Sequence, residues 1–228
     1  MTTVLIDRID GMLEQKSMLK HPFYQAWNSG KLTQEMLKDY ACQYHHFVKD
    51  FPRMVSAVHS NTPDISIRQE LLANLIDEEQ GTENHPALWM KFANAMGAPT
   101  SEVIDTEPLP STKALVDAMM TSCRKGTFLE GLAALYAYEA QIPEVSRTKI
   151  QGLKQFYGVT EAGAIQFFSV HEEADVYHSR SEREMIANNT PLELESAVEA
   201  AAQQTADALR RFLDGVYEEY VSHKIEVC

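Results

Sequence analysis

The sequence has few cysteines, and their spacing is not typical of metal binding or of disulfide pairing. Cys42, Cys123 and Cys228 lie far apart, and no CxxC pair occurs in the 228 residues. A disulfide framework and a structural zinc site are therefore not indicated. We expect reduced thiols.

Positive charge and long apolar runs are also scarce. The chain carries 20 Lys and Arg against 33 Asp and Glu, a formal net charge of -13, which argues against non-specific binding to nucleic acid or to an anionic membrane. No apolar run approaches the roughly 18 residues of a membrane span. Asp7, Asp10 and Glu14 interrupt the N-terminal apolar pattern, so a signal peptide is not predicted. We expect a cytoplasmic protein without nucleic acid or membrane as partners.

Alternating strand patterns are missing as well, and helical periodicity covers almost the whole chain. Thr33 is a suitable cap for a helix that Pro52 should kink rather than end, and Thr62 and Thr190, each followed by proline, should start two more helices. The inward positions of the last helix are Leu194, Val198, Ala201, Thr205, Ala208, Phe212 and Val216. Without a break in composition, these patterns predict an all-α bundle that forms a single domain over residues 1–228.

Two acidic residues stand where helical spacing predicts apolar side chains. In the segment 67–89, which reads as helix although Gly81 and Pro86 could distort it, the inward series is Leu71, Leu75, Glu78, Thr82, His85 and Trp89. In the segment 127–142, it is Phe128, Leu132, Leu135, Glu139 and Ile142. A lone buried carboxylate costs several kcal/mol, so such a group is normally paired, protonated or bound to a metal.

A third helix carries the strongest signal, in the stretch from His171 to His178. His171, Asp175 and His178 occupy positions i, i+4 and i+7, which fall within roughly 60° of arc on one helix face. Imidazole and carboxylate are ligands that iron and manganese accept. The proposed metal ligands are Glu78, His85, Glu139, His171, Asp175 and His178.

Each of these six residues alone could instead be a hydrogen-bonded or surface residue. As a set, they would hold two ions with positions left open for dioxygen or water. The other histidines lack acidic partners at helical spacing and are interpreted as surface or packing residues; they are His21, His45, His46, His59 and His223.

The residues also resemble a known family over nearly the whole chain. The most specific stretches are His21-Pro-Phe-Tyr24 with Trp27, Asp77-Glu78-Glu79 with Asn84-His85, Ala134-Leu-Tyr-Ala-Tyr138-Glu139 with Gln141-Ile142-Pro143, and His171-Glu-Glu-Ala-Asp175-Val-Tyr-His178. With these motifs the chain resembles the CADD-like proteins, a branch of the haem-oxygenase-like dimetal oxidases that is related in fold to the thiaminase and pyrroloquinoline-quinone-synthase groups. All six proposed ligands match the dimetal positions of that family.

The resemblance implies a haem-oxygenase-like bundle with an unusual activity. Members of the group are implicated in making para-aminobenzoate, the aromatic part of folate, from their own residues. Carried over, Tyr24 would be the sacrificed ring and Lys149 would give up its amino nitrogen. An iron/iron or iron/manganese pair would act with dioxygen and a reductant, whose donor the sequence does not identify. A homodimer is expected from the symmetry of most oligomers and from relatives of the fold.

The residues alone leave other roles open for these side chains. Tyr24 would then only pack with Phe23 and Trp27. Lys149 could reach the same cavity as Glu139 if the helix is kinked near Pro143, and burial would lower the pKa of its amine. The remaining tyrosines either line the cavity, pass electrons or fill core space; they are Tyr40, Tyr44, Tyr138 and Tyr177.

Four other functions also remain. The dimetal oxidase could act on an external amine or an amino-acid-derived substrate. A metal-free thiaminase-like hydrolase would use Cys123 or Cys42 as nucleophile, although neither has a histidine at suggestive spacing. A haem protein would use His21 as axial ligand, which leaves the three acids unexplained. In an interaction protein, the buried polar residues would be structural.

Overall fold

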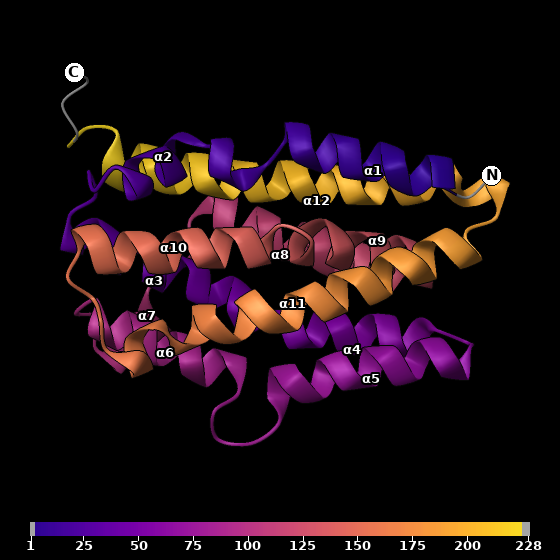
Figure 1. Cartoon of the computed structure of the whole chain (residues 1–228), viewed down its shortest axis with the longest axis horizontal. Coiled ribbons are helices and arrows are strands. Elements are labelled where there is room, and N and C mark those ends of the chain that lie inside the picture. Colours follow the sequence, from indigo (N-terminus) through magenta and orange to yellow (C-terminus); the bar gives the residue numbers. More distant parts are fainter. Residues whose placement is uncertain (1–2, 225–228) are drawn as a thin grey trace.

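The computed structural model describes residues 3–224, and within this range every regular element is a helix (Figure 1). The elements are α1 (Thr3–Gln15), η1 (Met18–Lys20), α2 (Pro22–Asn28), α3 (Gln34–Val48), α4 (Phe51–Asn61), α5 (Ile65–Glu79), α6 (His85–Ala95), α7 (Thr100–Asp105), α8 (Pro110–Lys125), α9 (Phe128–Glu139), α10 (Ile142–Phe156), α11 (Ala162–Asn189), η2 (Leu192–Leu194), α12 (Glu195–Val216) and η3 (Tyr217–Val221). The all-α prediction is confirmed.

Helix α9 forms the centre of the bundle. It packs against α12, α11, α8 and α4, and every residue from Leu129 to Glu139 is buried except the half-buried Glu130. In Figure 1, α1 and α12 run side by side along one edge, and α4 and α5 lie at the opposite edge. The long helix α11 crosses between these edges and contacts α9, α10, α6 and α5. Inward side chains of α11 therefore meet those of three or four neighbours.

Of the predicted helix starts, the one at Thr33 is confirmed. Thr62 and Thr190 instead end α4 and α11 as C-caps, and Asp64 caps α5. Pro52 also acts differently from the prediction. The hydroxyl of Thr33 accepts a hydrogen bond from the Met36 N–H, as a cap of α3 should. Helix α3 then ends at Val48 and α4 begins at Phe51, so the predicted kink is a complete break. Pro52 lies in the first turn of α4. The N–H groups of a first turn have no carbonyl partner within the helix, so proline costs no hydrogen bond there.

The helix predicted over residues 67–89 is wrong in its middle. Helix α5 ends at Glu79, Gly81 has a φ of 79°, and α6 begins at His85 with Asn84 as its cap. A positive φ cannot continue a right-handed helix, and Pro86 suits a first turn. Leu75 is half-buried and Thr82 exposed, whereas Asn74 is buried.

The segment 127–142 is likewise divided, because α9 ends at Glu139 and Ile142 is the first residue of α10. Leu132, Leu135, Glu139 and Ile142 are buried as predicted. The last helix follows its predicted pattern more closely. Of its seven predicted inward positions, all from Val198 to Val216 are buried and only Leu194 is half-buried.

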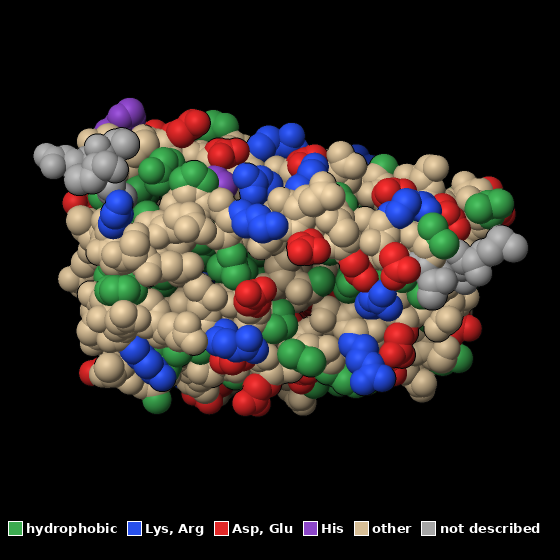
Figure 2. All heavy atoms as spheres, turned by 45° about the horizontal axis from the view of Figure 1, so that its top comes forward, with side chains coloured by type: hydrophobic (Ala, Val, Ile, Leu, Met, Phe, Trp, Pro, Cys, Tyr) green, Lys and Arg blue, Asp and Glu red, His purple; other side chains and the backbone are tan. Residues whose placement is uncertain are grey.

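The surface offers no concentrated field of one sign on the face drawn in Figure 2, where acidic and basic side chains alternate. Within residues 3–224, no helix combines the length and the apolar character needed to cross a membrane.

Candidate metal centre

The six residues proposed as ligands are all buried, and four helices bring them together. Glu78 lies near the end of α5, His85 at the start of α6 and Glu139 at the end of α9, and α11 carries the other three. Their exposed fractions range from 0% for Glu139 to 4% for His85 and His178. Three acids and three histidines with so little exposure are unusual in a protein core.

The six side chains form two groups of three. Glu78, His85 and His171 can each direct one ligand atom into a space where these atoms lie within 4.8 Å of one another, and Glu139, Asp175 and His178 do the same. We call them the Glu78 triad and the Glu139 triad. Helix α11 contributes to both, so the triads are neighbours along one helix face.

Several ligand atoms have no hydrogen-bond partner in the described structure. They are His85 Nδ1, Glu139 Oε2, Asp175 Oδ2 and His178 Nδ1. His85 Nδ1 is only 2.9 Å from Glu78 Oε1, but the two are not aligned as a hydrogen bond. Buried polar atoms are almost always paired, and lone pairs that converge without a donor suit a cation. The nitrogen and oxygen donors present therefore fit two divalent ions of the iron or manganese type.

In both imidazoles of α11, the ring nitrogen that does not face a triad contacts an oxygen atom that orients the ring. His171 donates through Nδ1 to the Phe167 carbonyl at 2.6 Å, which leaves Nε2 free as a ligand atom. His178 Nε2 lies 3.1 Å from the half-exposed Asp77 carboxylate, which leaves Nδ1 facing Asp175 at 3.7 Å. Such outer partners fix the tautomer and ring direction of metal-binding histidines. Asp77, off the predicted inward stripe, thus supports the Glu139 triad.

Burial and neighbouring like charges shift the pKa values of the triad residues. Burial, aided by neighbouring carboxylates, raises the pKa of Asp175 and of Glu139. Burial and the nearby His85 hold the pKa of His171 well below its usual range. Burial acts against a charged His178, but the neighbouring carboxylates of Asp175 and Glu139 outweigh it and raise its pKa to about 9. Divalent ions would relieve the repulsion among these acids.

Two buried polar residues of the centre escaped the sequence analysis. Asn74 donates a hydrogen bond to Glu139 Oε1 at 2.9 Å. Glu182 is 1% exposed and follows His178 by four residues. Continuing the spacing of His171, Asp175 and His178 by one more turn would have identified Glu182.

Lys149 is buried beside the centre inside a cage of aromatic rings. Its Nζ donates to the Tyr40 hydroxyl at 2.6 Å and lies 5.4 Å from the centre of the Tyr24 ring. The remaining rings of the cage belong to Trp27, Tyr44, Trp89 and Phe168. Burial lowers the pKa of Lys149 to about 7, so much of it is the neutral amine near neutral pH.

A row of tyrosines connects this cage with the metal centre. The rings of Tyr40 and Tyr44 stack with centroids 5.6 Å apart, and the hydroxyls of Tyr44 and Tyr138 are 2.7 Å apart. Tyr138 directly precedes Glu139. Burial raises the pKa of all three, which keeps the phenols neutral. Tyr177 differs, because it is 57% exposed and bonds to Glu70 at the surface.

The structure gives little support to the haem and thiol alternatives. His21 is buried, accepts the Phe23 N–H through Nδ1 and pairs with Asp214 through Nε2, so neither nitrogen is free for an axial bond. Burial raises the pKa of Cys123 to about 12 and also raises that of Cys42, the opposite of what a thiolate nucleophile needs. His45 and His46 are buried in packing positions.

Comparison with known proteins gives matches over most of the chain. The profile of the TENA/THI-4/PQQC family matches residues 7–219. A protein of Nitrosomonas europaea named 4-aminobenzoate synthase is 44% identical over 235 residues, covering 98% of this chain and 95% of that protein.

Solved structures agree on the fold. A CADD-like protein of unknown function from Nostoc punctiforme superposes with a TM-score of 0.80 at 19% identity, covering 97% of this chain and 99% of that one. A domain with a haem-oxygenase-like fold from Shewanella denitrificans gives 0.78 at 19% identity, with 96% and 92% covered. The predicted haem-oxygenase-like fold is confirmed.

Proposed function

Because the chain belongs to the TENA/THI-4/PQQC family and is 44% identical to a protein named 4-aminobenzoate synthase, we propose that it forms 4-aminobenzoate. The reaction depends on dioxygen and a dimetal centre, and it consumes residues of the chain itself. Tyr24 supplies the aromatic ring and Lys149 the amino nitrogen. The product is the aromatic part of folate.

The observation that carries this proposal is the position of Lys149 against Tyr24. The amine lies 5.4 Å from the centre of the Tyr24 ring, and the two residues are 3% and 2% exposed. A buried lysine without a carboxylate partner is costly, and Leu or Met would fill the same space more favourably. A chemical role for the amine accounts for that cost. The closed cage also favours a ring that belongs to the protein over one that must enter from solvent.

The metal centre and the cage would have different roles in the reaction. An iron/iron or iron/manganese pair held by the two triads would supply the activation of dioxygen, and a reductant would supply the remaining electrons. Lys149 holds its neutral, nucleophilic amine near the ring, because burial lowers its pKa to about 7. Tyr40, Tyr44 and Tyr138 offer a contiguous path between the cage and the centre. Since a ring is consumed, each chain should yield at most one product.

Isotope labelling tests the source of the ring and nitrogen. Protein made with ring-labelled tyrosine and side-chain ¹⁵N-lysine is loaded with Fe²⁺ and Mn²⁺, given a reductant and exposed to dioxygen. Mass spectrometry should find both labels in 4-aminobenzoate. Tyr24→Phe should yield none. Tyr217→Phe, at a half-buried tyrosine whose ring packs against His21, should retain the native yield. Unlabelled product would instead support an external substrate.

Elemental analysis tests the centre separately. We expect about two ions per native chain and their loss in a Glu139→Ala, His171→Ala double variant. A native chain that stays metal-free after reconstitution with both metals would contradict the dimetal proposal. We also expect a cytoplasmic homodimer, which light scattering of the metal-loaded protein tests for oligomeric state.

A further inference from the structure

Glu182 extends the ligand-bearing face of α11 by one turn. His171, Asp175, His178 and Glu182 follow one another at steps of four, three and four residues, so they share one helix face. All four are buried, and Glu182 is 1% exposed. Three members of this row belong to the two triads, and the position of the fourth calls for its own explanation.

Both carboxylate oxygens of Glu182 lack a hydrogen-bond partner in the described structure. The charged groups nearest to it are acidic, chiefly Glu139 and Asp175. Glu139 is a direct neighbour of Glu182. Its Oε2 is also unpaired, while Asn74 donates to Oε1. A structural role would give this buried acid a donor. Two neighbouring buried carboxylates with unpaired oxygens suit a cation between them.

We propose that Glu182 is a fourth protein ligand of the ion held by the Glu139 triad, an inference that rests on the dimetal centre proposed above. With Glu182, this site has three carboxylates and one imidazole, whereas the Glu78 triad has one carboxylate and two imidazoles. Carboxylate-rich sites suit Mn²⁺, and imidazole-rich sites suit iron. Glu182 thereby makes the two positions chemically different and assigns manganese to the Glu139 side.

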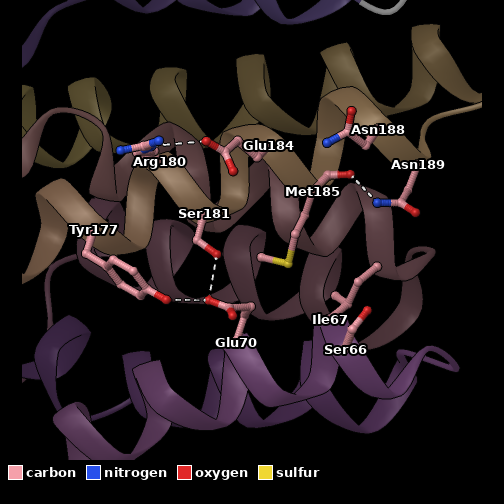
Figure 3. Close-up of a pocket in the computed structure, with 10 residues that line it drawn as sticks. All are labelled: Ser66, Ile67, Glu70, Tyr177, Arg180, Ser181, Glu184, Met185, Asn188 and Asn189. Atoms are coloured by element: carbon pink, nitrogen blue, oxygen red, sulfur yellow. Dashed lines mark hydrogen bonds and ion pairs between the residues drawn. The ribbon is translucent and has the colours of Figure 1, made fainter.

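The surroundings of Glu182 also connect this position with the surface. Asn74, His178 and Glu182 line a small void between α5 and α11, next to an open groove of about 520 Å³. Figure 3 shows how Tyr177 and Ser181 converge on Glu70 in that groove, with hydroxyl to carboxylate distances of 2.8 and 3.0 Å. These three residues line the void as well. An ion bound at Glu182 would therefore lie beneath this groove.

A metal titration of the full chain tests the inference. Metal-free native protein, Glu182→Gln and Glu184→Gln are titrated with Mn²⁺ alone, without oxygen, and free Mn²⁺ is read by electron paramagnetic resonance. Glutamine keeps the shape and can donate to Glu139, but it is a poor ligand. We expect Glu182→Gln to weaken one of two Mn²⁺ sites by roughly 10-fold or more and to leave the other unchanged. Glu184 is exposed and pairs with Arg180, so its variant should match native protein.

If each site of Glu182→Gln binds Mn²⁺ with the same affinity as the corresponding site of native protein, the inference is overturned and the dimetal proposal stays intact. Fewer than two ions per native chain when Fe²⁺ and Mn²⁺ are both supplied would overturn both. Thermal unfolding of the metal-free proteins checks for a structural effect: the midpoint of Glu182→Gln should equal or exceed the native one, and a clear decrease counts against the ligand role. A crystal structure of Mn²⁺-loaded native protein should have a Glu182 oxygen bonded to the ion, and an unbonded Glu182 would contradict the proposal independently of any variant.

Discussion

At the scale of the residue, the groups that surround the Lys149 amine determine its pKa. Its amine faces the hydroxyl of Tyr40 and the rings of Tyr24 and Tyr44. The charge of Lys149 also contributes to the lowered pKa of His171. No carboxylate bonds to the amine among residues 3–224. Desolvation is therefore the cause of the lowered pKa, and it makes the amine reactive at the expense of stability.

This cost leads to a prediction about stability and pH. The pKa of Lys149 is about 7 in the folded chain against 10.5 ordinarily, so between these values the unfolded chain binds the extra proton. Native stability should then rise with pH across this range by up to about 1.4 kcal/mol per pH unit, and the full cost applies below pH 7. Lys149→Met should be more stable than native protein below pH 7, with an advantage that shrinks as pH rises.

Urea unfolding of metal-free protein from pH 6 to pH 9 measures this difference. Lys154→Met, which replaces an exposed lysine of the same helix, should follow the native curve. A Lys149→Met advantage that does not change with pH would show that the amine is not desolvated in the folded chain.

At the scale of the element, the turn between α5 and α6 determines the Glu78 triad. Five residues, 80–84, separate the two helices and bring His85 Nδ1 to 2.9 Å from Glu78 Oε1. Gly81 adopts a φ of 79°, which a residue with a Cβ rarely does. The triad thus depends on one backbone conformation that lies outside both helices.

Gly81→Ala should consequently affect both stability and metal binding. A left-handed conformation costs roughly 1–2 kcal/mol for a residue with a Cβ. No atom within 4 Å opposes the new methyl group, so no steric cost is added to this backbone cost. We expect a decrease of that size in the free energy of unfolding, together with weaker binding at one of the two metal sites. Chemical unfolding and metal titration measure the two effects.

Gly163→Ala is the matched control. Gly163 is also free of neighbours within 4 Å but has no positive φ, and it is the second residue of α11. Its replacement should leave stability unchanged or slightly raised and should not alter metal binding. A Gly81→Ala protein that behaves like this control would mean that the turn does not hold the triad.

At the scale of the whole molecule, the centre connects helices that are distant in sequence. Glu78, His85 and Glu139 come from α5, α6 and α9, and all of them meet α11. Unliganded, these acids repel one another inside the core. Ions that bind the folded chain and not the unfolded one should therefore stabilise the whole bundle.

Metal loading should raise the thermal midpoint of the chain. At a free ion concentration of 100 times the dissociation constant, one site contributes about 2.7 kcal/mol. For a chain of this length, that corresponds to a rise of roughly 5–10 °C per site. Differential scanning fluorimetry with Mn²⁺ and with a chelator measures the shift.

A His85→Ala, His178→Ala variant, which removes one imidazole from each triad, should show little of this gain. If it gains as much as native protein, the ions act elsewhere on the chain.

The sequence by itself determined which side chains do not belong in an apolar core. Helical spacing is local, so Glu78, Glu139 and the row from His171 to His178 could be found without the fold, and the all-α architecture follows from the same periodicity. The family resemblance indicated Tyr24 and Lys149, which spacing alone left as packing or undefined residues. Glu182 was accessible to the same argument, because it continues the row by one turn.

Only the tertiary structure decided which of these residues meet. The division into two triads depends on how α5, α6 and α9 cross α11, and no local pattern specifies contacts between segments so far apart in the chain. The positive φ of Gly81 breaks the predicted helix and leaves Thr82 outside it, whatever the apolar pattern. Within α5, Asn74 rather than Leu75 is buried. The cage around Lys149 likewise gathers rings from four helices, α2, α3, α6 and α11. The desolvation that lowers the pKa of the amine exists only once these helices pack.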